Sequence, residues 1–425
     1  MNLPAESGLP AALGGAPTFP EGLPLARPSV PDPAAVGSVV ERVLTSGVMT
    51  NGPLVRELEL RAAEYLGVRH CVAVASCTAG LMLVLRAADL AGDVVVPSFT
   101  FAATAHAVAW NGLRPVFADV HPETLTLDPG SVSRALGVRT SAILATHVYG
   151  TPCDVEALEA LARTNGVRLF FDAAHAFGSR YRGVNVGGFG DAEVFSLSPT
   201  KILVAAEGGI IATDDDVLAE RCRIGRDYGN PGDYDCRFVG LNARMSELHA
   251  AVALDSLGGI EERIDRRNRL AGLYRRCLAE APGIGFPSVA PGDRSTFKDL
   301  TVLVDPDGFG MDADALAVAL SAEGVETRRY YSPPVHRMRA YAGSNGTPPL
   351  PWTERASAQA LALPLWTGMA GDLVERVAEA IRRIFRWAGE GTPPGHAQER
   401  YAGEPIPLRT TPPSLVTSAE ETDHA

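Results

Sequence analysis

Short apolar stretches recur along the central part of this 425-residue chain, and the segments between them have the periodicity of helices. Near-continuous apolar stretches are typical of strands buried on both faces, and their alternation with helices indicates a parallel sheet covered on both sides. The sequence therefore predicts an α/β fold with a mostly parallel seven-stranded sheet. The predicted strands are Cys71–Ala75, Val94–Pro97, Pro115–Asp119, Ser141–Thr146, Val167–Phe171, Ala192–Leu197 and Gly209–Thr213.

The segments on either side of this region have different compositions. Residues 1–33 are rich in Pro, Gly and Ala and are predicted to form an extended arm. The large domain is assigned to residues 34–262, and its first helical region is interrupted by the turn signal Thr50-Asn51-Gly52-Pro53. A smaller C-terminal α+β domain is assigned to residues 263–388, and the aperiodic, proline-rich residues 389–425 are predicted to be a disordered tail.

Within these domains the periodicity predicts further elements. They are helices at Met245–Leu257, Gly259–Ala281 and Asp372–Ala388, and strands near Thr301–Val304 and Val325–Tyr331.

Charge and cysteine usage exclude several classes of function. The net charge of −12 argues against non-specific binding to nucleic acid or anionic membranes. The six cysteines show no CxxC spacing, which favours free thiols over disulfides or a zinc site, so no metal is expected. The chain has neither a signal-peptide pattern nor an apolar run of about 18 residues. We therefore expect a cytoplasmic protein.

Lysine is almost absent from the chain, which has two lysines among its 38 basic residues. One of them, Lys201, follows a predicted strand in the Ser/Thr-rich turn Ser196-Leu197-Ser198-Pro199-Thr200. Arginine stays protonated, whereas a lysine can lose its proton when it is buried and then act as a nucleophile or base. Lys201 is therefore a candidate for amine chemistry, although a surface lysine would give the same pattern.

Three other strand ends carry candidate ligand-binding residues, because ligands of open α/β sheets bind at the carboxyl ends of the strands. Ser76-Cys77-Thr78-Ala79-Gly80 opens a helix and suits a phosphate, although an ordinary helix cap has the same sequence. Phe101 follows the next strand and is either a ring-stacking residue or part of the core.

Asp172 closes a strongly apolar strand. A buried carboxylate there needs a cationic partner such as a pyridinium nitrogen, unless Asp172 only caps a helix. A phosphate cradle, an aromatic ring, a carboxylate and an amine are together the requirements for binding pyridoxal 5′-phosphate.

Several blocks identify a family resemblance. SCTAGLMLVLRAADL, FFDAAHAFGSRYRGVNVGGFGDAEVFSLSPTK and GLNARMSELHAAVAL resemble the DegT/DnrJ/StrS group of sugar aminotransferases, and the resemblance runs from Leu25 to Ala388. It implies the fold-type-I aminotransferase architecture, pyridoxal phosphate as cofactor, and a homodimer with shared active sites.

The resemblance also implies roles for individual residues. Lys201 resembles the lysine that holds the cofactor covalently, and Asp172 the partner of its ring nitrogen. The other implied cofactor contacts are Ser76, Thr78, the Ala79 backbone and Ser196 at the phosphate, Phe101 and His175 at the ring, and Asn242 reaching the neighbouring subunit's phosphate. The chain departs from the family at Leu241, where tyrosine is usual, and at Cys77, where glycine is usual. A side chain at Cys77 requires a negative φ.

The implied activity is transfer of an amino group from glutamate or glutamine to a nucleotide-linked keto-sugar, as in deoxyaminosugar and antibiotic biosynthesis. The segment 327–337 resembles the sugar-contacting loop of members that aminate C4 of dTDP-4-keto-6-deoxyhexoses, and it supplies Arg329, Tyr330, Tyr331 and His336 as substrate-binding candidates. An exposed basic strand would have the same composition. The alternatives are a C3 aminotransferase and a non-catalytic regulatory protein of the same fold. A sugar dehydratase of this family would have histidine in place of Lys201.

Overall fold

The computed structural model describes residues 8–29, 32–342 and 348–389. Its core is a seven-stranded sheet of order β1-β9-β8-β5-β4-β2-β3, in which only β9 runs antiparallel to its neighbours. The strands are β1 His70–Val74, β2 Asp93–Pro97, β3 Arg114–Ala118, β4 Thr140–Thr146, β5 Arg168–Asp172, β8 Ala192–Ser196 and β9 Gly209–Thr213. All seven predicted strands and the mostly parallel sheet are confirmed.

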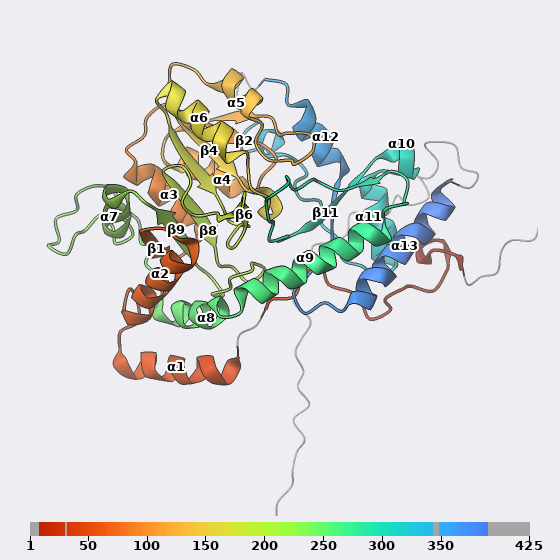
Figure 1. Cartoon of the computed structure of the whole chain (residues 1–425), viewed down its shortest axis with the longest axis horizontal. Coiled ribbons are helices and arrows are strands. Elements are labelled where there is room, and N and C mark those ends of the chain that lie inside the picture. The colour runs from red at the N-terminus through yellow and green to blue at the C-terminus, as the bar shows by residue number, and fades with distance from the viewer. Residues whose placement is uncertain (1–7, 30–31, 343–347, 390–425) are drawn as a thin grey trace, which may run out of the picture.

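Helices cover both faces of this sheet, as Figure 1 shows. Side chains of a strand alternate between faces: Val72 and Val74 of β1 pack with α3, α4 and α7, whereas Cys71 and Ala73 pack with α2 and α8. The covering helices are α2 Pro53–Leu66, α3 Cys77–Ala87, α4 Ala102–Trp110, α5 Pro129–Ala135, α6 Val155–Asn165, α7 Asp216–Gly225 and α8 Glu247–Leu257. The turn predicted at residues 50–53 separates α1, Pro33–Ser46, from α2.

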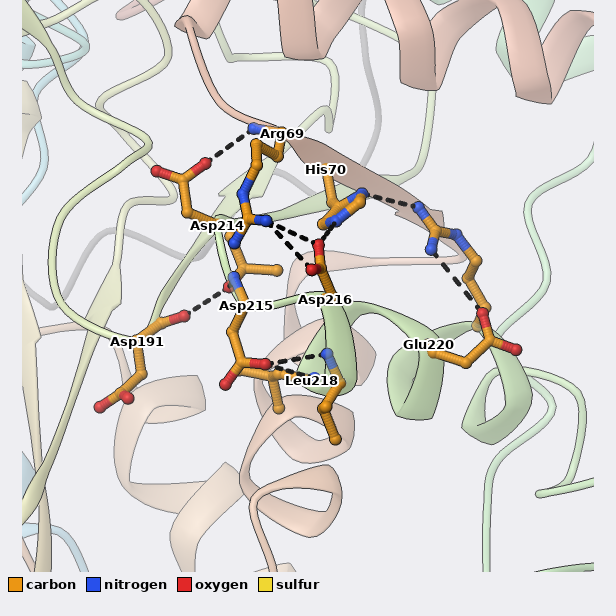
Figure 2. A network of polar contacts seen from close by, with 11 residues as sticks. Arg69, His70, Asp191, Asp214, Asp215, Asp216, Leu218 and Glu220 are labelled. Carbon is orange, nitrogen blue, oxygen red and sulfur yellow. Dashed lines mark hydrogen bonds and ion pairs between the residues drawn. The ribbon is translucent and has the colours of Figure 1, made fainter.

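A network of charged residues connects the amino end of β1 to the start of α7 (Figure 2). The Arg69 backbone N–H donates to Asp214, and the guanidinium of Arg69 and the ring of His70 both contact Asp216. Asp215 caps α7 by accepting from the N–H groups of Val217 and Leu218. These acidic residues are all partnered, and they lie at the opposite end of β1 from Ser76.

The small domain consists of α9, Ile260–Cys277, and an antiparallel sheet of order β10-β11-β12 with α11 and α13 packed against it. The remaining bounds are β10 Ile284–Gly285, β11 Leu300–Val304, β12 Ala360–Leu363, α10 Pro306–Phe309, α11 Ala313–Ala322, α12 Pro351–Gln359 and α13 Gly371–Gly389. The boundary proposed between residues 262 and 263 falls inside α9, so one continuous helix joins the two parts (Figure 1).

The strand predicted at Val325–Tyr331 is not formed. Val325 bridges only to Leu23, and Arg328 only to Ala362, because this extended segment lies between the N-terminal arm and β12. The chain then turns, with the Ser332 N–H donating to the Arg329 carbonyl. In its place β12, a four-residue apolar stretch, pairs with β11 and completes the three-stranded sheet.

The described part of the N-terminal arm lies on the small domain. Phe19 and Leu23 are buried in that domain's core. The fully buried carboxylate of Glu323 accepts from the N–H groups of Ala11 and Thr18 and pairs with Arg383. The tail predicted at 389–425 lies outside the described residues, apart from Gly389. No helix among the described residues is long and apolar enough to cross a membrane.

Candidate active site

A cavity of about 280 Å³ lies at the carboxyl ends of β1, β5 and β8, and residues of the small domain close it. It brings together nine residues singled out in the sequence: Ser76, Thr78, Phe101, Asp172, His175, Ser196, Lys201, Tyr330 and Tyr331. The strand ends place residues from distant parts of the chain around one space, as expected for an open α/β sheet.

Asp172 is the last residue of β5 and is 3% exposed. Its Oδ2 accepts from the Thr104 hydroxyl at 2.6 Å, and its Oδ1 accepts from the Ala174 N–H at 3.1 Å. Burial raises the pKa of this carboxyl, while these two hydrogen bonds and the nearby Lys201 act in the opposite direction. Each oxygen retains a lone pair, so Asp172 has acceptor capacity left for a cationic ligand group in the cavity.

Lys201 faces the same cavity. Burial, and to a smaller extent the positive charge of Lys298, lower the pKa of its amine from the ordinary 10.5 to about 8. A lysine with a pKa near neutral pH has a substantial fraction of free amine, which is the reactive form.

His175 lies beside Asp172 and Lys201 in the lining of the cavity. Its Nδ1 accepts from the Tyr149 N–H at 3.1 Å, which places the ring proton on Nε2. Burial and the charges of the two lysines hold the pKa of this imidazole well below its usual value. His175 therefore presents a neutral ring to the cavity.

Hydroxyl groups line the end of the cavity at the N-terminus of α3. Ser76 caps the helix by accepting from the Ala79 N–H at 3.1 Å, and its hydroxyl proton remains available to a ligand in the cavity. The helix-cap prediction is therefore confirmed and does not exclude a phosphate contact. The hydroxyls of Thr78, Ser196, Ser198 and Thr200 line the same cavity. Hydroxyl donors beside a helix N-terminus suit an anion. Cys77 lies in α3 and is not among the residues of positive φ, so the negative φ that a side chain at this position requires is present.

Phe101 is 62% exposed at the start of α4, so the alternative of a core residue is wrong. It stands at the cavity with its ring free of the protein core.

Four sequence candidates do not line the cavity in the described chain: Ala79, Asn242, Arg329 and His336. The Ala79 N–H is occupied by Ser76, and Asn242 is exposed in a backbone bridge to Asp227. The guanidinium of Arg329 caps α12 by donating to the carbonyls of 357, 358 and 360, and it also pairs with Asp314.

His336 is likewise engaged within the protein. Its Nδ1 lies 2.6 Å from the Ser98 hydroxyl and its Nε2 lies 2.8 Å from Glu354. The Ser98 contact fastens the 327–337 segment to the large domain, and the Glu354 contact ties it to α12. Of this segment's four candidates, Tyr330 and Tyr331 line the cavity, whereas Arg329 and His336 do not.

Lys298 and Asp299 also line the cavity, although neither is among the candidate site residues named from the sequence. They immediately precede β11 and come from the small domain. Lys298 is the second of the chain's two lysines. The rarity that singled out Lys201 applies equally to Lys298, but no strand-end motif surrounds it.

A buried carboxylate, a lysine of lowered pKa and an anion site around one cavity define a class of protein, the enzymes that bind a phosphorylated pyridine cofactor. The family profile described as "DegT/DnrJ/EryC1/StrS aminotransferase family" matches residues 34–382. The chain belongs to this family. It is an aminotransferase of the fold-type-I architecture, and pyridoxal 5′-phosphate is its cofactor.

Relatives and solved structures agree with this assignment. The dTDP-4-amino-4,6-dideoxy-D-glucose transaminase of Escherichia coli is 32% identical over 366 residues, 84% of this chain and 98% of that protein. The dTDP-3-amino-3,4,6-trideoxy-alpha-D-glucose transaminase of Streptomyces venezuelae is 37% identical over 361 residues, 84% and 92% of the two chains. The structure of DesI in the presence of its TDP-sugar product superposes with a TM-score of 0.85 at 42% identity, covering 90% of this chain and 97% of that one.

Proposed function

We propose that this protein transfers an amino group from glutamate or glutamine to a nucleotide-linked keto-sugar, at C4 of dTDP-4-keto-6-deoxyglucose, in deoxyaminosugar and antibiotic biosynthesis in the cytoplasm. The observation that carries the proposal is the cavity itself, where Lys201 and Asp172 of the large domain face Tyr330 and Tyr331 of the small domain. The relatives named as dTDP-aminosugar transaminases support the substrate class.

Each residue of the cavity has a proposed task. Bound pyridoxal phosphate supplies a carbonyl that takes up amines and a ring that accepts electrons. Asp172 holds a proton on the ring nitrogen, since its buried carboxylate is stabilised by a cationic partner. The free amine of Lys201 would take a proton from the donor's α-carbon as a base and deliver it to the C4′ carbon of the cofactor as an acid.

Binding and orientation fall to the surrounding side chains. Ser76, Thr78 and Ser196 hold the phosphate at the N-terminus of α3. Phe101 and the neutral ring of His175 flank the cofactor. Tyr330 and Tyr331 contact the sugar, and the buried ring of Tyr331 stacks on Tyr149, which fixes its position.

We propose a homodimer in which Asn242 completes the phosphate site of the neighbouring subunit. Its exposed position outside its own chain's cavity agrees with this role. Apolar side chains exposed on and just after α1, including Leu44 at 58% and Val48 at 45%, supply surface for such an interface.

The test incubates purified protein with glutamate and dTDP-4-keto-6-deoxyglucose, and separately with the 3-keto isomer, and assigns the aminated carbon by NMR. We expect a 4-amino product from the first substrate. Exclusive turnover of the 3-keto isomer would establish the C3 alternative. Absence of both product and bound cofactor would favour a non-catalytic regulator, a reading that leaves the arrangement of Lys201 and Asp172 unexplained.

A further inference from the structure

Lys298 and Asp299 form a charged pair in the wall of the cavity, where both side chains are largely buried at 8% and 7% exposure. The Lys298 Nζ lies 2.7 Å from the Asp299 Oδ1 and 5.6 Å from the centre of the Tyr330 ring. The backbone is fixed as well, since the Lys298 N–H donates to the Tyr149 carbonyl and Arg267 donates to the Lys298 carbonyl. The pair is therefore held in place before a ligand arrives.

One oxygen of this pair has no partner. The Oδ2 atom of Asp299 is buried and makes no hydrogen bond to any described residue. An unsatisfied buried acceptor costs about 1–3 kcal/mol, and more when it carries charge. Proteins keep few such groups. Because Asp299 belongs to the lining of the cavity, a ligand bound there can supply the missing donor.

The hydrogen-bond donor that Asp299 Oδ2 lacks can be matched to one of the two substrates of the proposed reaction. An ionised carboxylate only accepts hydrogen bonds, so its partner must bring an O–H or N–H group. The carboxylates of the amino donor carry no hydrogen-bond donor for Asp299 Oδ2, and its amine is the reacting group. The keto-sugar brings neutral hydroxyls beside its carbonyl, which fit an acceptor.

The pair also lies close to the reacting amine. Lys298 and Asp299 influence the pKa of Lys201 in opposite directions, lowering and raising it respectively. Lys201, Lys298 and Asp299 line the same cavity, so a sugar bound there with its reacting carbon at Lys201 can also meet Asp299.

We propose that Asp299, held by Lys298, accepts a hydrogen bond from the sugar hydroxyl adjacent to the reacting carbonyl and thereby selects keto-sugars that carry this hydroxyl. The inference rests on the proposed sugar-aminotransferase function and adds a specificity-determining contact to it.

The test separates the two half-reactions by the absorbance of the cofactor. Wild type is first shown to aminate the keto-sugar; failure at this step contradicts the proposed function and not Asp299 in particular. In Asp299→Asn the KM for the keto-sugar rises about 10- to 100-fold, as expected for a hydrogen bond to a charged group, while the amino-donor half-reaction changes less than about threefold. Asp307→Asn removes an equal charge from an exposed position of the same domain and is the control.

A substrate analogue tests the contact directly. In the wild type, replacing the adjacent hydroxyl by hydrogen raises the KM of the sugar half-reaction by a factor similar to that of Asp299→Asn. In Asp299→Asn the same replacement raises the KM by less than about threefold, because the substitution and the missing hydroxyl remove the same interaction. An equal penalty in both enzymes, or equal losses in both half-reactions of the variant, overturns the proposal. If Asp299→Asn does not fold, the wild type decides: undiminished use of the deoxy analogue overturns the proposal, and its loss supports it.

Discussion

Replacement of Asp172 by Asn tests whether this carboxylate works on the cofactor or only supports the local fold. The amide retains the shape of the side chain and can still accept from the Ala174 N–H. Its NH₂ group then faces the Thr104 hydroxyl, which can turn its own proton toward Thr100 at 2.8 Å. We therefore expect the free energy of unfolding to change by about 1 kcal/mol, the size of one rearranged neutral hydrogen bond.

The effect on catalysis is larger because the amide cannot stabilise a protonated ring nitrogen. A hydrogen bond to a charged group contributes about 1.5–3 kcal/mol, which corresponds to a loss of about 10- to 150-fold in turnover. The assay measures turnover of the variant with its cofactor content checked by absorbance, so that loss of binding is not mistaken for loss of chemistry.

A matched variant controls for the substitution itself. Asp191 accepts from the Leu169 N–H at 2.7 Å and pairs with Arg168, at the end of β5 opposite the cavity. Asp191→Asn is expected to lower stability and leave turnover close to wild type. Near-normal turnover of cofactor-loaded Asp172→Asn would refute the reasoning and reduce Asp172 to a structural role.

Three further outcomes follow from the structure. In Lys298→Met the removal of a neighbouring cation raises the pKa of Lys201 above about 8. The rate at which apo-protein binds pyridoxal phosphate, followed by absorbance, therefore reaches its plateau at a higher pH than in the wild type; an unchanged pH–rate profile contradicts this coupling. Mixing inactive Lys201→Ala and Asn242→Ala subunits restores about a quarter of wild-type activity if sites are shared, by counting for random C₂ dimers, whereas no recovery after confirmed subunit exchange shows that each chain builds its own site. Glu323→Ala removes the acceptor of the Ala11 and Thr18 N–H groups and the ion-pair partner of the partly exposed Arg383. It is expected to lower the free energy of unfolding by about 1–3 kcal/mol in denaturant titrations; an unchanged value means that the arm adds little stability.

The large domain is the part of this fold that its sequence predicts best. Strands buried on both faces carry apolar residues on both, such as Phe170 and Phe171 in β5, and these near-continuous apolar stretches are easily recognised in the sequence. The prediction of a strand at 325–331 is wrong although the segment is extended. Its backbone bridges are divided between Leu23 and Ala362, and only the tertiary structure brings these two residues beside it.

The candidate site divides in a similar way. Residues at the carboxyl ends of strands, including Asp172 and Ser196, are predictable because these ends of a parallel sheet meet at one edge. Arg329 is not, since a basic residue in a substrate-like loop has the same sequence whether it contacts a ligand or caps α12. Asp299 enters the cavity through the packing of the small domain against the large one, and no local pattern marks it.

The central claim is that Lys201 is the amine that holds the cofactor. The chain has two lysines and the structure places both in one cavity, so a single mapping experiment decides between them. Borohydride reduction of the holoenzyme fixes the cofactor to its lysine, and mass spectrometry of the digested protein locates the adduct. We predict the adduct on Lys201, whose pKa of about 8 leaves a reactive free amine. An adduct on Lys298, with Lys201 unmodified, would contradict the account.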